Sequence, residues 1–389
     1  MIRFLYLILF LLLPSWRSSS AGIQTAQKLS KSILPPPYDS LLKGKYLDMH
    51  CHVAGIGSGG SGCFLSPDIQ SSYKFNLYLK AFGVTKDEIV KQGDGLIFDH
   101  IISGLEGSQS VGAAVILAMD GVIDKNGNLD TARTQVFVPN AYVLKYTQKF
   151  PRLLYGPSIN PKRRDAILRL EQAKRDGAVL IKWIPSIQLF DPSDTAFTAF
   201  YLAMKRLNLP LLAHTGKESS FKTAQNELCD PQKLRLPLRL GVTVIAAHVA
   251  TKGKNEGEDN MLRIVSMFPQ YPNLYSEISS LTQVNKLGLL SKILEFPELN
   301  HRLMYGTDYP LIQTQLVSPY FFPLKLSIKQ MQAIGKIKNP WDQDVALKKA
   351  LGVQAEVFEL SAKILIQAKP KQKTIAPVRK QKTKTRRSH

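Results

Sequence analysis

The sequence predicts an α/β fold, specifically a (β/α)8 TIM barrel with a long insertion after its first strand and a helical segment near the C-terminus. Eight short apolar runs rich in β-forming residues recur from residue 45 onward, and stretches with helical periodicity separate them. Several runs are continuous rather than alternating, which is typical of parallel strands covered on both faces. The eight βα units occupy about 270 residues, close to the usual size of such a barrel. A doubly wound open sheet is the alternative that the same pattern allows.

Each apolar run is expected to form one strand. The connection 53–110 is long enough to carry helices over the barrel mouth, and residues 342–367 should form a terminal helical segment that packs on the outside. The expected strands are Tyr46–His52, Val111–Asp120, Leu153–Ile159, Ala178–Pro185, Pro210–Thr215, Val242–His248, Leu274–Ser279 and Leu303–Asp308.

Two of the intervening stretches show helical patterns plainly. Residues 163–176 place Ile167, Leu170 and Ala173 on one side of a helix. Residues 194–208 begin with an aspartate that suits an N-cap and carry a stripe of aromatic and other apolar side chains. Both patterns indicate amphipathic helices packed against a sheet.

The two ends of the chain differ from this pattern. Residues 1–21 have the features of a cleaved signal peptide: a basic residue, an apolar run of ten residues, and Ala21 before the cut. An uncleaved N-terminal anchor is the alternative. Residues 22–44 are expected to be a linker, residues 45–366 the barrel, and residues 367–389 a disordered basic tail. We therefore expect an exported protein, either periplasmic or secreted.

Charge is unevenly distributed along the chain. The sequence contains 51 Lys and Arg against 30 Asp and Glu, a formal net charge of +21, and nine of the basic residues lie in the 367–389 tail, which has no acidic residue. Such a tail can contact anionic envelope or lipid surfaces, and no specific nucleic acid partner is expected. An apolar content of 44% with 21% charged residues excludes a fully disordered or multi-span membrane chain.

The first expected strand ends in a pair of histidines. His50 and His52 are two residues apart and should face the same way, while Cys51 points away. Two imidazoles on one face can hold a metal ion between them. Taken alone, the pair is equally compatible with two surface histidines.

Other expected strands end in the same kind of side chain. His214, His248 and Asp308 each close an apolar run, and Lys182 lies inside another. A buried His, Asp or Lys needs a partner, because burying it unpaired is costly. The C-terminal ends of barrel strands meet on the face where active sites are built. The pattern therefore predicts one shared metal site.

Taken together, the motifs resemble the metal-dependent amidohydrolase superfamily. The closer resemblance is to its amidohydrolase-2 branch, which includes aminocarboxymuconate-semialdehyde-decarboxylase-like enzymes. The resemblance covers about residues 45–366. The matching motifs are LDMHCH, NAYVLKYTQKFPRLLYGPSINP, GAVLIKWIPSIQLFDPSD, PLLAHTGKE, AAHVA and YGTDYP.

The resemblance implies roles for these residues. It implies that His248 orients water or binds a second metal, and that Lys182 matches a lysine that is carbamylated and bridges two metals in some branches. One Zn²⁺ is favoured, with two if Lys182 is carbamylated. The implied metal ligands are His50, His52, His214 and Asp308, the last being alternatively a general base.

The expected function is that of a metal-dependent hydrolase, in which a zinc-activated water attacks the carbonyl of an amide, lactone or ester in a small substrate. Asp308 or His248 would accept the proton, and Lys217 and Glu218 could contact substrate charge. One alternative is a metal-dependent non-oxidative decarboxylase of an unsaturated or aromatic carboxylic acid. A second alternative, from another class, is a non-catalytic exported binding protein on the same barrel, which would be expected to have lost metal ligands.

Few other features of the sequence bear on function. Cys63 and Cys229 lie in two connections on the active-site side, where oxidation could pair them, but the sequence does not supply their separation. His100 and His301 are interpreted as ordinary loop or helix residues.

Overall fold

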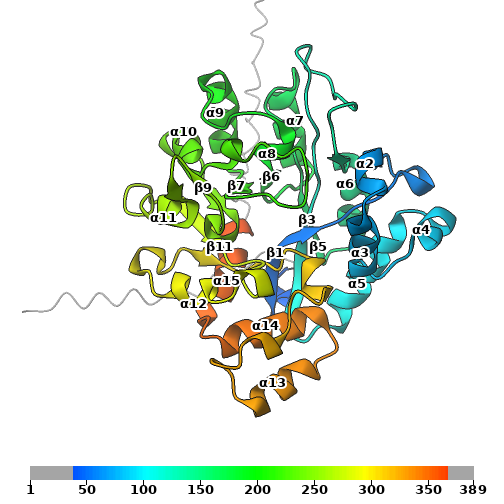
Figure 1. Cartoon of the computed structure of the whole chain (residues 1–389). Helices are drawn as coiled ribbons and strands as arrows, with labels where there is room; N and C mark the ends of the chain where they lie inside the picture. The colour runs from blue at the N-terminus through cyan, green and yellow to red at the C-terminus, as the bar shows by residue number, and fades with distance from the viewer. Residues whose placement is uncertain (1–37, 367–389) are drawn as a thin grey trace, which may run out of the picture. The chain divides into compact units, whose positions relative to one another are not determined.

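The computed structural model describes residues 38–366. Within this range eight parallel strands form two hydrogen-bonded sets, β1-β3-β5 and β6-β7-β8-β11-β12 (Figure 1). All eight expected strands are present, each within its expected range. Their bounds are β1 Tyr46–His52, β3 Val111–Leu117, β5 Leu153–Gly156, β6 Ile181–Trp183, β7 Leu211–Ala213, β8 Val244–Ala246, β11 Leu274–Glu277 and β12 Leu303–Met304.

Backbone hydrogen bonds join the two sets into a closed barrel. Next to β5 and β6, the Lys182 N–H donates to the Pro157 carbonyl at 2.9 Å. Next to β1 and β12, the His52 N–H donates to the Tyr309 carbonyl at 2.9 Å, and Cys51 forms a parallel bridge with Tyr309. Both edges are therefore paired, which confirms the (β/α)8 TIM barrel and excludes the open sheet.

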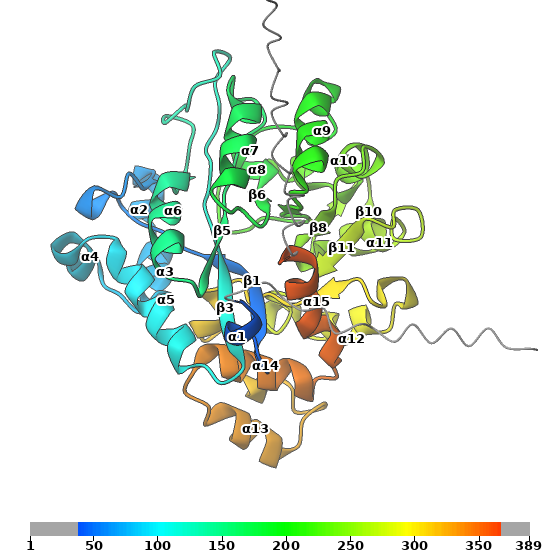
Figure 2. The same cartoon turned by 180° about the vertical axis from the view of Figure 1, so that it is seen from behind.

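Helices occupy the connections between the strands (Figures 1 and 2). Two short antiparallel pairs, β2 Phe64–Leu65 with β4 Val136–Phe137 and β9 Lys254–Asn255 with β10 Glu258–Asp259, lie in loops. The helices are α1 Tyr38–Leu41, α2 Pro67–Gln70, α3 Tyr73–Ala81, α4 Lys86–Gln92, α5 Gly95–Gly107, α6 Asn140–Lys149, α7 Ala166–Arg175, α8 Pro185–Gln188, α9 Thr198–Leu207, α10 Arg235–Arg239, α11 Asn260–Val265, α12 Leu289–Leu294, α13 Ile328–Gly335, α14 Pro340–Ala350 and α15 Ala355–Leu365.

The two helices with clear sequence patterns form as expected, with one difference. The Asp194 carboxylate accepts from the Ala196 N–H at 2.9 Å and caps the turn that leads into α9. Helix α7 buries Leu170 and Ala173, but Ile167 is 38% exposed. The face of α7 that packs on the barrel therefore includes Leu170 and Ala173 but not Ile167, which lies at its edge.

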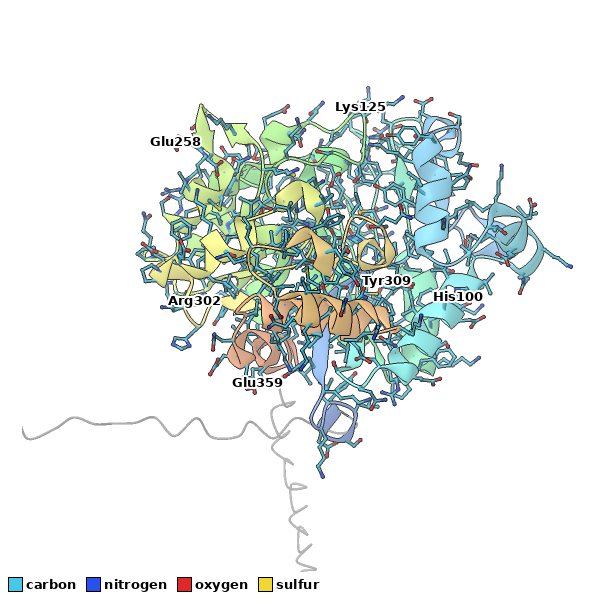
Figure 3. All side chains as sticks on the ribbon, turned by 60° about the horizontal axis from the view of Figure 1, so that its bottom comes forward. His100, Lys125, Glu258, Arg302, Tyr309 and Glu359 are labelled. Atoms are coloured by element: carbon cyan, nitrogen blue, oxygen red, sulfur yellow. The ribbon has the colours of Figure 1, made fainter. Side chains whose placement is uncertain are left out.

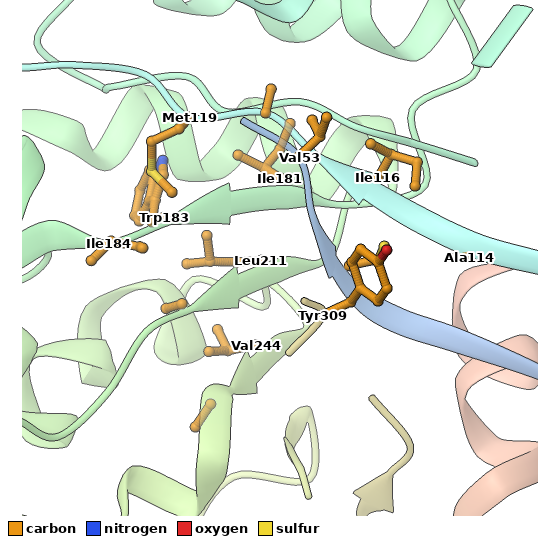
Figure 4. Packing of buried hydrophobic residues seen from close by; sticks show 14 of the residues in the cluster. Val53, Ala114, Ile116, Met119, Ile181, Trp183, Ile184, Leu211, Val244 and Tyr309 are labelled. Atoms are coloured by element: carbon orange, nitrogen blue, oxygen red, sulfur yellow. The ribbon is translucent and has the colours of Figure 1, made fainter. Parts of the chain in front are cut away.

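Side chains on the outer face of the strands pack against the helices. Ile181, Trp183, Leu211 and Val244 lie on successive strands in this layer (Figure 4). The Trp183 ring lies 4.8 Å from the ring of Phe190, measured between centroids. Trp183 therefore stabilises the junction of barrel and helices and does not line the site.

The inner faces of the strands form a second buried cluster, to which the C-terminal helix contributes. Ala362, Leu365 and Ile366 belong to this cluster, so α15 covers one end of the barrel interior. Trp341 and Val345 of α14 and Phe358 of α15 belong instead to the outer cluster, so the expected terminal segment packs on the outside only in part. Leu42 joins the same cluster, so the last part of the range expected as a linker belongs to the barrel. The strand residues of the cluster are Leu47, Met49, Ala113, Val115, Leu117, Leu154, Leu180, Leu212, Ile245, Ala247 and Met304.

Three further expectations concern the cysteines and the chain ends. Cys51, Cys63 and Cys229 are all free and buried, so the disulfide considered between Cys63 and Cys229 is not formed. Within residues 38–366 no helix is both long enough and apolar enough to span a bilayer. The expected signal peptide 1–21, most of the 22–44 linker, and the 367–389 tail lie outside the described residues, and export stays a prediction.

A buried ion pair attaches α14 to the end of β12. The Lys348 ammonium donates to the Asp344 carboxylate at 2.8 Å and to the Gly306 carbonyl at 2.9 Å, and both side chains are buried. Gly306 precedes the segment that carries Asp308. The Lys348–Asp344 pair therefore fixes the segment after β12, which carries Asp308 at the mouth of the barrel.

We predict that Lys348→Met lowers the free energy of unfolding by about 3–5 kcal/mol, because it leaves the Asp344 charge buried without a partner. The matched control is Lys363→Met, which removes the exposed pair with Glu359 on α15 and should cost about 0.5 kcal/mol or less. Urea denaturation of both variants measures the difference. Equal losses in the two variants would contradict a dominant role for the buried pair.

Candidate metal centre

The histidine pair faces the barrel interior because of a β-bulge in β1. Leu47 and Met49 both point into the interior cluster, so strict alternation would turn His50 outward. The pairing with β3 shifts register between Asp48 and Cys51, which adds one residue to β1 at this point. After the bulge, Cys51 packs in the outer cluster, and the two histidines face inward as predicted.

Asp48 fixes the bulge to the neighbouring strand end. Its buried carboxylate accepts from the N–H groups of His50 and Thr307 at 3.0 Å each and from the Trp341 indole N–H at 2.9 Å. Burial raises the pKa of Asp48 to about 6, against these hydrogen bonds, which lower it. Asp48 thereby ties β1, the segment after β12, and α14 together.

Three candidate ligand atoms meet where β1 and β12 end. The Nε2 atoms of His50 and His52 are 3.1 Å apart. One Asp308 carboxylate oxygen lies 3.6 Å from the first and 3.4 Å from the second. Burial alone would raise the pKa of Asp308, but the hydrogen bond with His52 and the nearby imidazoles hold it well below its usual range. The carboxylate is therefore ionised, as a metal ligand must be.

Glu277, which the sequence analysis did not single out, organises two of these histidines. Its fully buried carboxylate accepts from His50 Nδ1 at 3.1 Å, from the His248 backbone N–H at 2.9 Å and from the Ser279 hydroxyl at 2.9 Å. A proton on His50 Nδ1 leaves a lone pair on Nε2, the atom that faces Asp308. Glu277 lies inside the expected strand Leu274–Ser279 but ends the observed strand β11, so the rule applied to strand ends did not single it out.

The segment after β12 approaches these groups closely. A Cβ atom added to Gly306 would lie 2.9 Å from the His50 Cβ and 3.2 Å from a Glu277 carboxylate oxygen. Glycine is therefore needed at this position to let the backbone pass beside the site.

His248 is aimed into the site by an unusual backbone turn. His248, Val249 and Ala250 all have positive φ angles, of 58°, 50° and 49°, which is a strained conformation for residues with side chains. The His248 Nδ1 lies 2.8 Å from the Ser279 hydroxyl, which itself donates to Glu277. His248 Nδ1 is therefore the donor to Ser279, and its Nε2 is free to accept a proton.

The His248 ring lies between two other imidazoles. Its centroid is 5.2 Å from that of His50 and 5.2 Å from that of His214. Ligand atoms of His50, His248 and Asp308 all lie within 4.8 Å of one another. Burial lowers the pKa of His248 well below its usual value, which keeps the imidazole neutral.

His214 has an unsatisfied nitrogen at this site. Its Nε2 is buried and, among the described residues, has no hydrogen-bond partner, although a Glu218 oxygen is 3.6 Å away. A buried polar atom without a partner is costly and fits a ligand position. Glu218 is buried beside the site as expected, whereas Lys217 is exposed and does not join it.

Lys182 lies below the histidines. Its side chain is fully buried, and the ammonium nitrogen is 2.9 Å from His50 Nε2. Burial lowers the pKa of Lys182 to about 8, while the carboxylates of Asp308, Glu277 and Glu218 oppose this shift. Burial, followed by the charge of Lys182, lowers the pKa of His50 to about 4.

A cavity of about 500 Å³ opens directly above these groups. His52, His214, His248 and Asp308 line one end of it, and the insertion between β1 and β3 covers much of the rest. His100 lies on the exposed side of α5 (Figure 3), so it does not contribute to the site. The exposed His301 does not contribute either.

Comparison with known proteins identifies a family. The sequence profile of the amidohydrolase family (Amidohydro_2) matches residues 108–330, more than half of the chain. The match includes Lys182, His214, His248 and Asp308, whereas β1 with its histidine pair lies ahead of it. No curated protein matches the sequence.

Several solved structures are similar at low identity. An uncharacterised TIM-barrel protein from Bordetella bronchiseptica is 16% identical, with a TM-score of 0.47, over 78% of this chain and 99% of that one. A probable 2-pyrone-4,6-dicarboxylic acid hydrolase from Acinetobacter baumannii is 16% identical, with a TM-score of 0.47, over 83% and 96% of the two chains. A 5-carboxyvanillate decarboxylase from Sphingomonas paucimobilis is 10% identical, with a TM-score of 0.45, over 83% and 99%.

These structural similarities are weak, so the barrel rests on its own hydrogen bonding and the family on the sequence match. The strand-end histidines and aspartate agree with the resemblance seen in the sequence motifs. The chain belongs to the amidohydrolase family, in the amidohydrolase-2 branch of the metal-dependent amidohydrolase superfamily.

Proposed function

We propose that the protein is a zinc-dependent hydrolase that cleaves an amide, lactone or ester bond in a small substrate. The observation that carries the proposal is the convergence of His50, His52 and Asp308 at one end of a cavity, beside a neutral His248 with a free Nε2. Nitrogen and oxygen ligands in this combination suit Zn²⁺.

We propose one ion, held by His50, His52 and Asp308, with His214 as a further ligand. The unpartnered His214 Nε2 fits this role, and so does His50 Nε2, whose lone pair Glu277 leaves available and which Lys182 Nζ contacts at 2.9 Å. When bound, the ion supplies an activated water and polarises the scissile carbonyl. One ion is proposed on the resemblance to the amidohydrolase-2 branch, with two if Lys182 is carbamylated.

The side chains around the ion would move the protons. His248 accepts a proton at Nε2, because its Nδ1–H is held by Ser279 and the charge that develops is stabilised by Glu277, 3.4 Å from Nδ1. The same nitrogen then donates the proton to the leaving group. Lys182 does not line the cavity, so we assign it to the positioning of His50 rather than to contact with substrate.

The cavity wall has few cations to hold an acidic substrate away from the metal ligands. It contains no arginine, and one of its two lysines, Lys74, already donates to the Ser219 carbonyl at 3.1 Å. Apart from the proposed ion and its ligand Asp308, the wall has two acidic and two basic side chains, so we prefer hydrolysis of an uncharged substrate to decarboxylation of an acid. The charged wall residues are Asp68, Lys74, Glu218, Lys222 and Asp308.

We predict that the purified protein contains about one zinc ion per chain and hydrolyses simple esters or lactones, and that a chelator abolishes this activity until zinc is restored. His50→Ala and His52→Ala should lose zinc and turnover together, each by at least about a hundredfold. His100→Ala, on the exposed side of α5, is the matched control and should retain both. Metal analysis and product detection test this. Release of CO₂ from an acid without ester or lactone hydrolysis would favour the decarboxylase, and full activity without metal would exclude both.

We further predict that Glu277→Gln weakens zinc binding by about 10–100-fold, because an amide cannot accept all the donors that surround this carboxylate. Competition with a chromogenic chelator measures the affinity. Glu258→Gln is the control, since Glu258 is exposed and pairs with Arg263 away from the site. Unchanged zinc affinity in a folded Glu277→Gln variant would show that Glu277 does not orient a ligand.

A further inference from the structure

We infer that the cavity binds the non-reacting part of the substrate as an uncharged, apolar chain of medium length, positioned beneath α2 and α3. The inference rests on the proposed function for the hydrolysis at the end of the substrate that lies near the metal ligands. It adds the chemical class of the substrate, which the family match does not provide.

The cavity has two chemically distinct ends. Its ionisable histidines and Asp308 gather where the strands end, as described above. Beyond them the wall is mainly aliphatic and aromatic, and much of it comes from three parts of the chain: the insertion between β1 and β3, which includes β2, the residues of and around β4, and the loop after β7. Representative wall residues are Leu65, Ile69, Phe75, Leu79, Val136 and Phe221. A chain of methylene groups buries apolar surface against such a wall without leaving polar groups unpaired.

The charged groups on the wall offer little to a second acidic group. The Glu218 carboxylate already accepts from the Ser220 N–H at 2.5 Å and faces His214 with its other oxygen. The lining cations are Lys74, which donates to the loop after β7, and the exposed Lys222. The second carboxylate of a dicarboxylate would therefore lie mostly against apolar side chains, where it loses hydration.

Contacts across the top of the cavity limit the access of water. Lys74 on α3 donates to the Ser219 carbonyl, and the Gln135 amide donates to the Thr223 hydroxyl. These bonds tie the insertion and the segment before β4 to the loop after β7. Tyr73, which lines the cavity and is 75% exposed, places an aromatic ring where the cavity meets solvent. An apolar chain can enter past such a ring and then lie against the apolar wall.

Two series of ligands test the inference. The first is the binding of straight-chain primary alcohols, from butanol to decanol, to the metal-free protein by calorimetry. The second is the hydrolysis of p-nitrophenyl esters, from acetate to decanoate, by the zinc-loaded protein. We expect the Kd of the alcohols to fall about fourfold for each added methylene until the cavity is filled. We expect kcat/KM of the esters to rise over the same chain lengths.

Variants locate the effect in this cavity. Ile69→Lys places a charge on the apolar wall and should lower both decanol affinity and the decanoate-to-acetate ratio of kcat/KM by at least about tenfold. Phe221→Ala, which removes apolar surface without adding charge, should also lower the decanol affinity and the decanoate-to-acetate ratio of kcat/KM. Val90→Lys is the matched control, because Val90 lies on α4 of the same insertion, is 60% exposed and does not line the cavity. Val90→Lys should leave the decanol affinity and the decanoate-to-acetate ratio of kcat/KM unchanged.

The outcomes separate this inference from the proposed reaction. Alcohol binding that tightens with length, without hydrolysis of any ester, lactone or amide of matching chain length, would retain the apolar site and overturn the hydrolase. Ester hydrolysis without any dependence on chain length would retain the hydrolase and overturn the apolar site. Tighter binding of succinate or phthalate than of an uncharged ligand of equal size would also overturn the inference.

Discussion

The buried carboxylate of Glu277 is the group on which the geometry of the site depends. It accepts from His50 Nδ1, from the backbone of His248 and from Ser279, so a single residue at the end of β11 orients groups at the ends of β1 and β8. Burial of a carboxylate is costly, and this cluster of donors offsets the cost and keeps the pKa of Glu277 below its usual value. The positive φ angles of His248, Val249 and Ala250 persist because the His248 N–H has this acceptor.

The barrel supplies the rigidity that such an arrangement needs. Hydrogen bonds at both seams close the ring of strands, and Asp48 joins the bulge in β1 to Thr307 and to Trp341 of α14. On the other side of the same segment, Lys348 of α14 holds the Gly306 carbonyl. The C-terminal helices therefore belong to the scaffold of the metal centre. A small displacement of β1 or of the segment after β12 would move the candidate ligand atoms apart, so the contacts from these helices matter for the site.

Chemistry and specificity occupy different parts of the structure. The proposed metal ligands and His248 come from strand ends, where positions are determined by the barrel. The apolar wall comes largely from the insertion after β1 and the loop after β7, which can vary without disturbing the ligands. Under the proposed function, this division would let the barrel act at a carbonyl group while a separate surface selects the attached chain.

Residue order predicts the eight strands, the insertion, and the histidines and aspartate at strand ends, because burial on both faces and strand periodicity are local patterns. It also predicts that His50 and His52 face the same way, but the backbone feature that turns them into the barrel is visible only in the folded chain. Met49 and His50 both point inward because pairing with β3 places a bulge between Asp48 and Cys51, and residue order alone does not encode a register shift. The same holds for Glu277 as the organising carboxylate, for α15 across the barrel end, for the exposed Lys217 and for the free Cys63 and Cys229. Each depends on neighbours that are distant in sequence, so the physical cause is long-range packing rather than local pattern.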